Sequence, residues 1–294
     1  MKRALIVYSQ ISGRNNRYKV NHWLKRYLSR KKYLLDFKNY ENFVSDSELA
    51  DKFPYDLVVV AGGDGTIRTV ATFLIKNRIN VPIAIVPTGS ANLLAHGLGI
   101  PRRPKSAIRA ILRSKPLAID VGCINKNCYF LDAFTIGYIA DRILGADRKW
   151  KDYFGFWGYV LSFFFNRRLP HYTFRFTVDG QEYCHEGNSL FIVNTNKIYG
   201  FISRRPINLC DGKFELTIAT NKHFWGFFQA LYYYYFHQKP PKHLVISQGA
   251  KYSIQLDVPI NAQIDGDYME YPAGAKTIEI EVLPKRLTVL KPRD

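Results

Sequence analysis

A short apolar strand that leads directly into a glycine-rich turn constrains the fold of this chain more than any other feature. Residues 56–61 (DLVVVA) are almost wholly apolar, which is typical of a strand covered on both faces. Residues 62–66 (GGDGT) follow, and a helical pattern begins there. Glycines permit a tight turn that brings backbone N–H groups close to an anion, and the helix N-terminus adds a favourable dipole. The pattern predicts a phosphate-binding turn at the end of a buried parallel strand.

The next predicted strand ends in a similar way. Residues 82–86 lead into Pro87-Thr88-Gly89-Ser90-Ala91-Asn92, and a third polar loop that contains Ser12 and Gly13 follows the first strand. Because the carboxyl ends of parallel strands share one edge of a sheet, these loops predict a nucleotide site there. Neither G-x-x-x-x-G-K-[ST] nor G-x-G-x-x-G is present.

Strand and helix patterns alternate over residues 1–120, whereas strand patterns dominate residues 121–284. Alternation favours a parallel α/β sheet, and Asp-Gly pairs between strands favour antiparallel hairpins. The predicted class is therefore α/β + β, with an N-terminal α/β nucleotide-binding domain and a C-terminal β-rich sandwich domain. The first part is predicted to have strands at 4–8, 34–37, 56–61 and 82–86 and helices at 18–30, 47–52, 66–77, 91–96 and 105–113. The second is predicted to have strands at 173–178, 190–193, 214–219, 252–258, 277–282 and 287–290.

Asp64 is an unusual residue for a phosphate-binding turn. A carboxylate beside phosphates repels them unless a divalent cation or a proton-transfer role compensates. An Asp at this position can also act simply as a helix cap.

The composition indicates an anionic partner. The chain has 42 Lys and Arg against 24 Asp and Glu, a net charge of +18. Nucleic acid, an anionic membrane surface and a phosphate-bearing substrate all fit such a charge. We expect no nucleic-acid binding, because the sequence contains no recognisable nucleic-acid-binding module. No apolar run reaches the length of about 20 residues that a membrane-spanning helix needs, so a cytoplasmic location is expected.

Two aromatic segments, at residues 153–165 and 224–236, suit contact with a membrane surface. Lys105, Arg109 and Arg113 recur at helical spacing and are candidates for a second, basic membrane contact. These features predict a peripheral association with the inner face of the membrane. The aromatic segments are equally compatible with buried helices or with a homodimer interface.

Taken together, GGDGT at 62–66 and PTGSANLLAHGLGIP at 87–101 resemble the catalytic domain of the diacylglycerol kinase family. This family includes soluble bacterial lipid kinases, sphingosine kinases and ceramide kinases. The resemblance continues at residues 119–122 (IDVG), at Asp211-Gly212 and at Asp265-Gly266-Asp267, and therefore spans nearly the whole chain.

The resemblance implies a lipid kinase that transfers the γ-phosphate of ATP to a lipid hydroxyl, with its active site in an interdomain cleft and residues 285–294 completing the first domain. Asp265 or Asp267 would act as general base, and Asp64 and Asp120 would belong to a magnesium–water network. Asp211 would hold a structural Mg²⁺. The residues that match the ATP-binding positions are Ser12, Gly13, Gly62, Gly63, Asp64, Gly65, Thr66, Gly89, Ser90 and Asn92.

Some positions depart from the family pattern. Asp267 replaces the usual Glu, Leu93 replaces a frequent Asp, and Arg68 and Thr69 stand where many members have Asn and Glu. Two alternatives therefore stay open. One is an NAD kinase, which also carries GGDGT, and the other is a catalytically silent protein that binds lipid or membrane.

Overall fold

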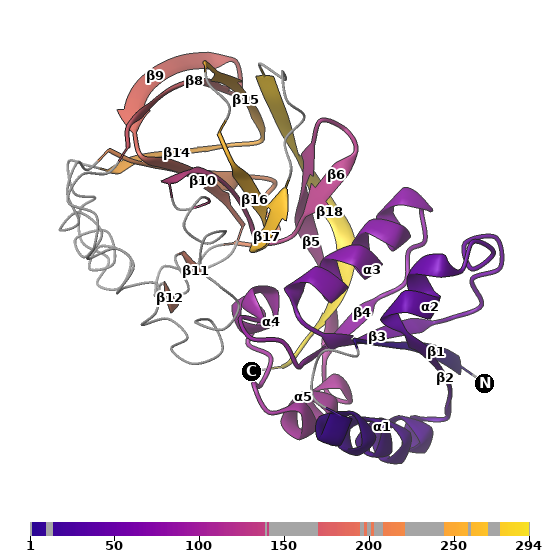
Figure 1. Ribbon diagram of the computed structural model, residues 1–294. Coiled ribbons are helices and arrows are strands. Elements are labelled where there is room, and N and C mark those ends of the chain that lie inside the picture. Colours follow the sequence, from indigo (N-terminus) through magenta and orange to yellow (C-terminus); the bar gives the residue numbers. More distant parts are fainter. Residues whose placement is uncertain are drawn as a thin grey trace. The chain divides into compact units, whose positions relative to one another are not determined.

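The computed structural model (Figure 1) describes most of the chain. The chain folds into two compact units. The first unit, here called the N-terminal unit, contains residues 1–119 and 285–294, and the second contains residues 120–284. The predicted boundaries were 1–120 with 285–294, and 121–284. The described residues are 2–9, 14–138, 140, 170–194, 197–198, 201–202, 208–220, 244–257, 260–269 and 277–293. Both predicted aromatic segments lie outside them.

The N-terminal unit is built on a parallel sheet, as predicted. Its strands lie in the order β2-β1-β3-β4, with parallel pairing throughout. The C-terminal end of β18 extends this sheet, because Val289 pairs in parallel with Ile83. This return of the last strand was also expected. The strands are β1 (Lys2–Tyr8), β2 (Tyr33–Asn39), β3 (Leu57–Gly62), β4 (Ile83–Pro87) and β18 (Thr277–Lys291).

Helices cover both faces of the parallel sheet (Figure 1). The continuous apolar runs in β1 and β3 explain this, because successive side chains point to opposite faces and both faces of the sheet are therefore apolar. Val20 and Leu24 of α1 and Ile108 of α5 share one core cluster with Ile6 and Val59 of the strands. On the other face lie α2 and α3. The bounds are α1 (Arg14–Leu28), the 3₁₀ turn η1 (Ser29–Lys31), α2 (Tyr40–Ser45), α3 (Asp64–Lys76), α4 (Leu93–Gly97) and α5 (Pro104–Ile111).

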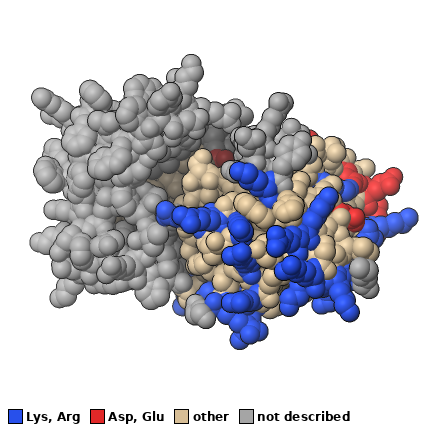
Figure 2. All heavy atoms as spheres, turned by 90° about the horizontal axis from the view of Figure 1, so that it is seen from below, with Lys and Arg blue, Asp and Glu red and all other residues tan. Residues whose placement is uncertain are grey.

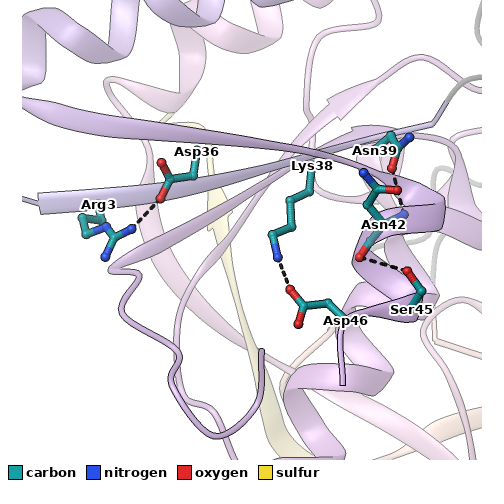
Figure 3. Close-up of polar contacts among 7 residues, drawn as sticks. All are labelled: Arg3, Asp36, Lys38, Asn39, Asn42, Ser45 and Asp46. Atoms are coloured by element: carbon teal, nitrogen blue, oxygen red, sulfur yellow. Dashed lines mark hydrogen bonds and ion pairs between the residues drawn. The ribbon is translucent and has the colours of Figure 1, made fainter. Parts of the chain in front are cut away.

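The predicted helix at 47–52 is wrong, and α2 precedes that position (Figure 3). The helix begins early because the side-chain oxygen of Asn39 accepts a hydrogen bond from the N–H of Asn42 at 2.8 Å. An Asn at this position satisfies one of the unpaired N–H groups at a helix start. The chain after Asp46 forms turns, in which Asp51 N–H donates to the Glu48 carbonyl at 3.2 Å.

Ion pairs gather on the same side of the N-terminal unit as α2 (Figure 3). Arg3 and Asp36 form a half-exposed pair at 2.7 Å between β1 and β2. Lys38 and Asp46 form a second pair, and the Lys38 ammonium group lowers the pKa of Asp46. These contacts place the carboxylates of this region beside local cations.

The second unit is a sandwich of two mainly antiparallel sheets, as predicted. One sheet has the order β14-β13-β10-β7-β16-β17, and in the other β9, β8 and β15 are followed by the N-terminal part of β18. One core cluster joins Phe134 and Leu216 of the first sheet to Phe174 and Ile278 of the second. The bounds are β5 (Lys115–Ile124), β6 (Cys128–Phe130), β7 (Ala133–Gly137), β8 (Tyr172–Val178), β9 (Gln181–Gly187), β10 (Ser189–Val193), β11 (Lys197–Ile198), β12 (Phe201–Ile202), β13 (Phe214–Ala219), β14 (Leu244–Gly249), β15 (Lys251–Leu256), β16 (Ala262–Ile264) and β17 (Asp267–Met269).

Two strands predicted at 277–282 and 287–290 form one continuous strand, β18. Pro284 lies between them and favours a break in a sequence-based reading, because proline cannot donate to a strand ladder. Among the described residues, no helix combines the length and the apolar character needed to cross a membrane.

Candidate active site

The first glycine turn joins β3 directly to α3. Gly63 is the residue that precedes α3, and its carbonyl accepts a hydrogen bond from Ile67 N–H at 3.1 Å. A Cβ atom at Gly62 would lie 2.6 Å from the Cβ of Thr66, so no larger residue fits there. The first N–H groups of a helix have no partner within the helix. The turn therefore directs backbone donors and the positive end of the helix dipole to the carboxyl end of β3.

The two glycine turns touch each other. Thr88 N–H donates to the Gly62 carbonyl at 3.1 Å. A Cβ atom at Gly89 would lie only 2.5 Å from the Cα of Gly63, and one at Gly63 would lie 3.2 Å from the Cα of Gly89. Glycine at both positions lets the two backbones meet. This contact brings together the two turns that the sequence predicted to share an edge of the sheet.

Asn92 organises the second turn from within. Its side-chain oxygen accepts a hydrogen bond from Gly89 N–H at 3.0 Å, and its amide group donates to the Gly89 carbonyl at 2.6 Å. The residue has a φ of 49°, a left-handed conformation that Asn tolerates better than most residues, and it directly precedes α4. Asn92 is thus engaged with its own loop, while Ser90 is exposed. Ser12 and Gly13 lie outside the described residues.

Two hydroxyl groups beside the turns were not among the predicted site residues. Thr88 Oγ1 is buried and has no hydrogen-bond partner among the described residues. Thr69 Oγ1 donates to the Gly65 carbonyl at 3.0 Å and lies 3.1 Å from the Tyr40 hydroxyl. Thr69 therefore supports the first turn of α3 from the side. The position of Thr88 directly after the buried strand β4 was the feature of the sequence that could have identified it as a site residue.

Asp120 and the Asp211-Gly212 turn meet in the second unit. Asp120 is fully buried, and its Oδ2 accepts a hydrogen bond from Gly212 N–H at 2.6 Å. Its own N–H donates to the Leu209 carbonyl at 2.8 Å. Asp211 is exposed, and its Oδ1 accepts from Lys213 N–H at 3.1 Å. The two residues predicted to bind metal thus lie in one local network, one carboxylate inside and one outside.

Asp265 is the first residue of a two-residue hairpin turn and Asp267 directly follows that turn, and the two acids have opposite environments. Asp265 and Gly266 have φ values of 51° and 85°, and Ile264 pairs with Asp267 across the turn. Such a turn is typical of the Asp-Gly sequence. Asp267 is exposed, whereas Asp265 is only 5% exposed. The two carboxylates therefore diverge.

The buried carboxylate of Asp265 is held by a row of backbone donors. Leu131 N–H lies 3.0 Å from Oδ2, and the N–H groups of Asp132 and Ala133 lie 2.8 and 3.1 Å from Oδ1. The Asp265 N–H also donates to the Ala133 carbonyl at 2.9 Å. Hydrogen bonds to a charged acceptor are roughly twice as strong as neutral ones. Asp265 thus fixes the hairpin that carries Asp267 to the loop before β7.

Asn194 completes this part of the second unit, and sequence reasoning missed it. It is fully buried, and its amide group donates to the carbonyls of Asp120 and Leu131 at 3.0 and 3.1 Å. Its own N–H donates to the Asp132 carbonyl at 2.8 Å. Asn194 follows the apolar strand β10 directly, which is the same strand-end pattern that revealed the glycine turns.

Comparison with known proteins agrees with this arrangement. Residues 3–124 match the diacylglycerol kinase catalytic domain. The chain is 26% identical to a diacylglycerol kinase of Staphylococcus aureus (strain MRSA252) over 309 residues, covering 100% of this chain and 93% of the relative.

Solved structures resemble the fold at lower identity. A diacylglycerol kinase from Bacillus anthracis has a TM-score of 0.75 and 18% identity, with 99% of this chain and 97% of that chain covered. A yeast NADH kinase in complex with NADH has a TM-score of 0.54 and 12% identity, with coverage of 100% and 84%. Over residues 3–124, the chain is thus similar to the catalytic domain of the diacylglycerol kinase family.

Proposed function

We propose that this chain is an ATP-dependent lipid kinase that transfers the γ-phosphate of ATP to the hydroxyl group of a lipid. The observation that carries the proposal is the backbone contact between Gly63 and Gly89, at the ends of β3 and β4. Gly62 and Pro87 are paired in these neighbouring parallel strands. Two such turns at one edge of a sheet form a suitable cradle for the phosphates of a nucleotide.

The cradle has further features that suit a nucleotide. The N–H groups at the start of α3 are oriented to bind phosphate oxygens, and the dipole of this 13-residue helix favours negative charge there. The buried hydroxyl of Thr88 can donate to a phosphate or ribose oxygen, which would satisfy a polar atom that otherwise has no partner in the described part of the chain. Asn92 keeps the second turn in its binding shape.

The acidic residues fit a magnesium ion. Mg²⁺ prefers oxygen ligands and usually binds one or two carboxylates together with substrate phosphates and water. In the described residues no group of three or more His, Cys, Asp and Glu side chains is placed to hold a metal, so a site made by protein alone does not form there. Asp64 of the N-terminal unit and Asp120 of the second unit are the candidates for the magnesium–water network, and Asp211 is the candidate ligand of a structural ion. When bound, the ion would neutralise negative charge on the phosphates.

We assign the proton transfer to Asp267 and a positioning role to Asp265. The exposed carboxylate of Asp267 is able to accept a proton from the lipid hydroxyl, whereas the oxygens of Asp265 already accept three backbone N–H groups. As the hydroxyl loses its proton, its oxygen forms a bond to the γ-phosphorus. The bond between the γ-phosphorus and the bridging oxygen breaks, and ADP leaves.

The test is incubation of the purified protein with labelled ATP, Mg²⁺ and a panel of acceptors. The panel contains a diacylglycerol, a sphingoid base and NAD, each alone and in competition. We expect label in a lipid product and none in NADP. Transfer to NAD alone would establish the NAD kinase alternative. The similarity in fold to the yeast NADH kinase is the observation that favours this alternative. Nucleotide binding without transfer to any acceptor would favour the silent lipid-binding alternative.

A further inference from the structure

Acidic residues are absent from most of the N-terminal unit's sequence. Residues 1–35 and 65–119 contain 19 Lys and Arg and no Asp or Glu. Residues 36–64 contain seven Asp and Glu against two Lys. The negative charge of residues 1–119 therefore comes from one stretch of the chain, and the flanking stretches have no countercharge of their own.

The fold turns this separation along the sequence into a separation between two sides. The acidic stretch forms β2, α2 and the loop before β3, where Asp36 and Asp46 are paired with Arg3 and Lys38. The stretches without acids supply α3, which lies on the same face of the sheet as α2, and also α1, η1 and α5, which lie on the opposite face (Figure 1). The exposed cations of this opposite side form what is here called the basic face: Lys19, Lys25, Arg26, Arg30, Lys31, Lys105, Arg109 and Arg113.

The basic face has no acidic partners in the described part of the chain. None of its eight cations forms an ion pair with a described Asp or Glu. Figure 2, which views the molecule from below Figure 1, shows Lys and Arg side chains spread over this side and the acidic side chains gathered at its margin. Eight cations without countercharge on one side produce a positive potential that attracts an extended anionic partner.

Aromatic rings support part of the basic face. Lys105 Nζ lies 5.9 Å from the centre of the Trp23 ring, and the Arg109 guanidinium lies 5.6 Å from that of Tyr27. Arg109 Nε also donates to the Tyr27 hydroxyl at 2.9 Å. This bond, together with the charges of Arg109, Lys105 and Arg26, lowers the pKa of Tyr27. The rings of Trp23 and Tyr27 are partly exposed between the cations.

We propose that the basic face docks the protein onto the surface of a bilayer that contains anionic lipids. The proposal rests on the proposed function, because a lipid acceptor is held in such a bilayer. Trp and Tyr with neighbouring Lys and Arg are the side chains favoured at the headgroup level. Each cation near an anionic surface strengthens binding by about fivefold. Duplex nucleic acid is the competing partner for a surface of this charge, and the test includes it.

The experiment compares two variants with equal net charge. The test variant carries Arg26→Gln, Lys31→Gln and Arg113→Gln, which are exposed basic-face cations, and the control carries Lys52→Gln, Lys76→Gln and Lys126→Gln, which are exposed elsewhere. Affinity is measured by co-sedimentation with vesicles of phosphatidylcholine, with and without phosphatidylglycerol. We expect the test variant to bind the anionic vesicles on the order of a hundredfold more weakly than the wild type. The control should stay within about threefold, and high salt should weaken all binding.

Three results would overturn the proposal. They are equal losses in the two variants, equal binding to vesicles with and without phosphatidylglycerol, and tighter binding to a DNA duplex than to anionic vesicles at equal phosphate concentration. The kinase assay with a short-chain lipid dispersed in detergent separates this proposal from the proposed function. If that lipid is phosphorylated while the vesicle results fail, only the docking surface is refuted. If the vesicle results hold and no acceptor is phosphorylated, only the kinase proposal is refuted.

Discussion

The two units of the chain differ in charge as much as in architecture. The N-terminal unit has 25 Lys and Arg against 8 Asp and Glu, a net charge of +17, while the second unit has 17 against 16, a net charge of +1. Almost the entire excess of +18 thus resides in the parallel α/β unit, although it is the smaller of the two. A net charge of this size affects which molecules a protein binds more than it affects which fold the protein adopts. We therefore expect an anionic partner to bind the N-terminal unit, whereas the acids proposed for proton transfer belong to the nearly neutral second unit.

The sharpest test of the second unit's role uses its two hairpin acids. Asp267→Asn should lower kcat by about 10²–10⁴-fold, because it removes the proposed general base. The melting temperature should not change, since Asp267 is exposed. Steady-state kinetics with saturating ATP and lipid measures the first effect and thermal unfolding the second.

Asp265→Asn and Asp267→Glu are the matched controls for that test. Asp265→Asn should lower stability by about 1–3 kcal/mol, because buried backbone donors lose a charged acceptor. Asp267→Glu should retain activity, since it keeps a carboxylate at this position and restores the Glu of the family pattern. A full loss of kcat in Asp265→Asn at unchanged stability, with activity retained in Asp267→Asn, would transfer the role of base to Asp265.

The N-terminal unit is tested at the contact between its two glycine turns. Gly89→Ala should weaken ATP binding by roughly 5- to 150-fold, the equivalent of about 1–3 kcal/mol of overpacking, because its Cβ would lie 2.5 Å from the Gly63 Cα. Gly63→Ala should have a smaller effect, since its Cβ would lie 3.2 Å from the Gly89 Cα. Calorimetric titration with a non-hydrolysable ATP analogue measures both, and equal affinity in all three proteins would contradict the proposed cradle.

Tyr252 tests whether the units can be perturbed separately. Its buried hydroxyl lies 2.6 Å from the carbonyls of Phe214 and Gly249 and accepts from Gly249 N–H at 3.0 Å, and burial raises its pKa. Tyr252→Phe should lower the free energy of unfolding by about 1–3 kcal/mol, because it leaves these groups without their partner. Tyr183→Phe is the control, expected within about 0.5 kcal/mol. Denaturant unfolding and ATP titration are measured separately on each variant. For Tyr252→Phe we expect a loss of stability without a loss of nucleotide binding.

The smallest expected effect concerns the acidic side of the N-terminal unit. Lys38 lowers the pKa of Asp46, so the pair stabilises the fold at pH values above the carboxyl's ordinary pKa and loses this contribution as the pH falls through the lowered value. Lys38→Met should therefore raise the pKa of Asp46 toward that of a free carboxyl. An NMR titration of the Asp46 carboxyl carbon would detect the change. An unaltered midpoint would show that Lys38 does not lower the pKa of Asp46.

The sequence was sufficient for those features that depend on a repeating pattern or on a local turn. The alternation of apolar strands and helices predicted the parallel sheet, and Asp-Gly pairs predicted the hairpins at Asp179 and Asp265. The two glycine turns could be paired in advance because strands that neighbour each other in a parallel sheet end at one edge. The α2 prediction failed because one side chain, Asn39, determines where that helix begins.

Features that depend on tertiary contacts were beyond the sequence. Asp265 and Asp267 stand one residue apart, and only the hairpin shows that one is buried against Leu131–Ala133 and the other exposed. Asn194 hydrogen-bonds to Asp120, which is far away in the chain, and the hydroxyl of Thr88 is buried by the fold. Neither property can be read from the local sequence. The separation of acidic and basic stretches was present in the printed residues, but its meaning depends on which helices share a face of the sheet.

Strand β18 has a consequence for how the protein is made. Val289 supplies the neighbour of β4, yet it is synthesised after nearly all other residues of this sequence. Until then β4 has an open edge, and open strand edges are sites of aggregation. The edge of β4 therefore stays unpaired while the second unit is translated, and we expect the nascent chain to be prone to aggregation during that time.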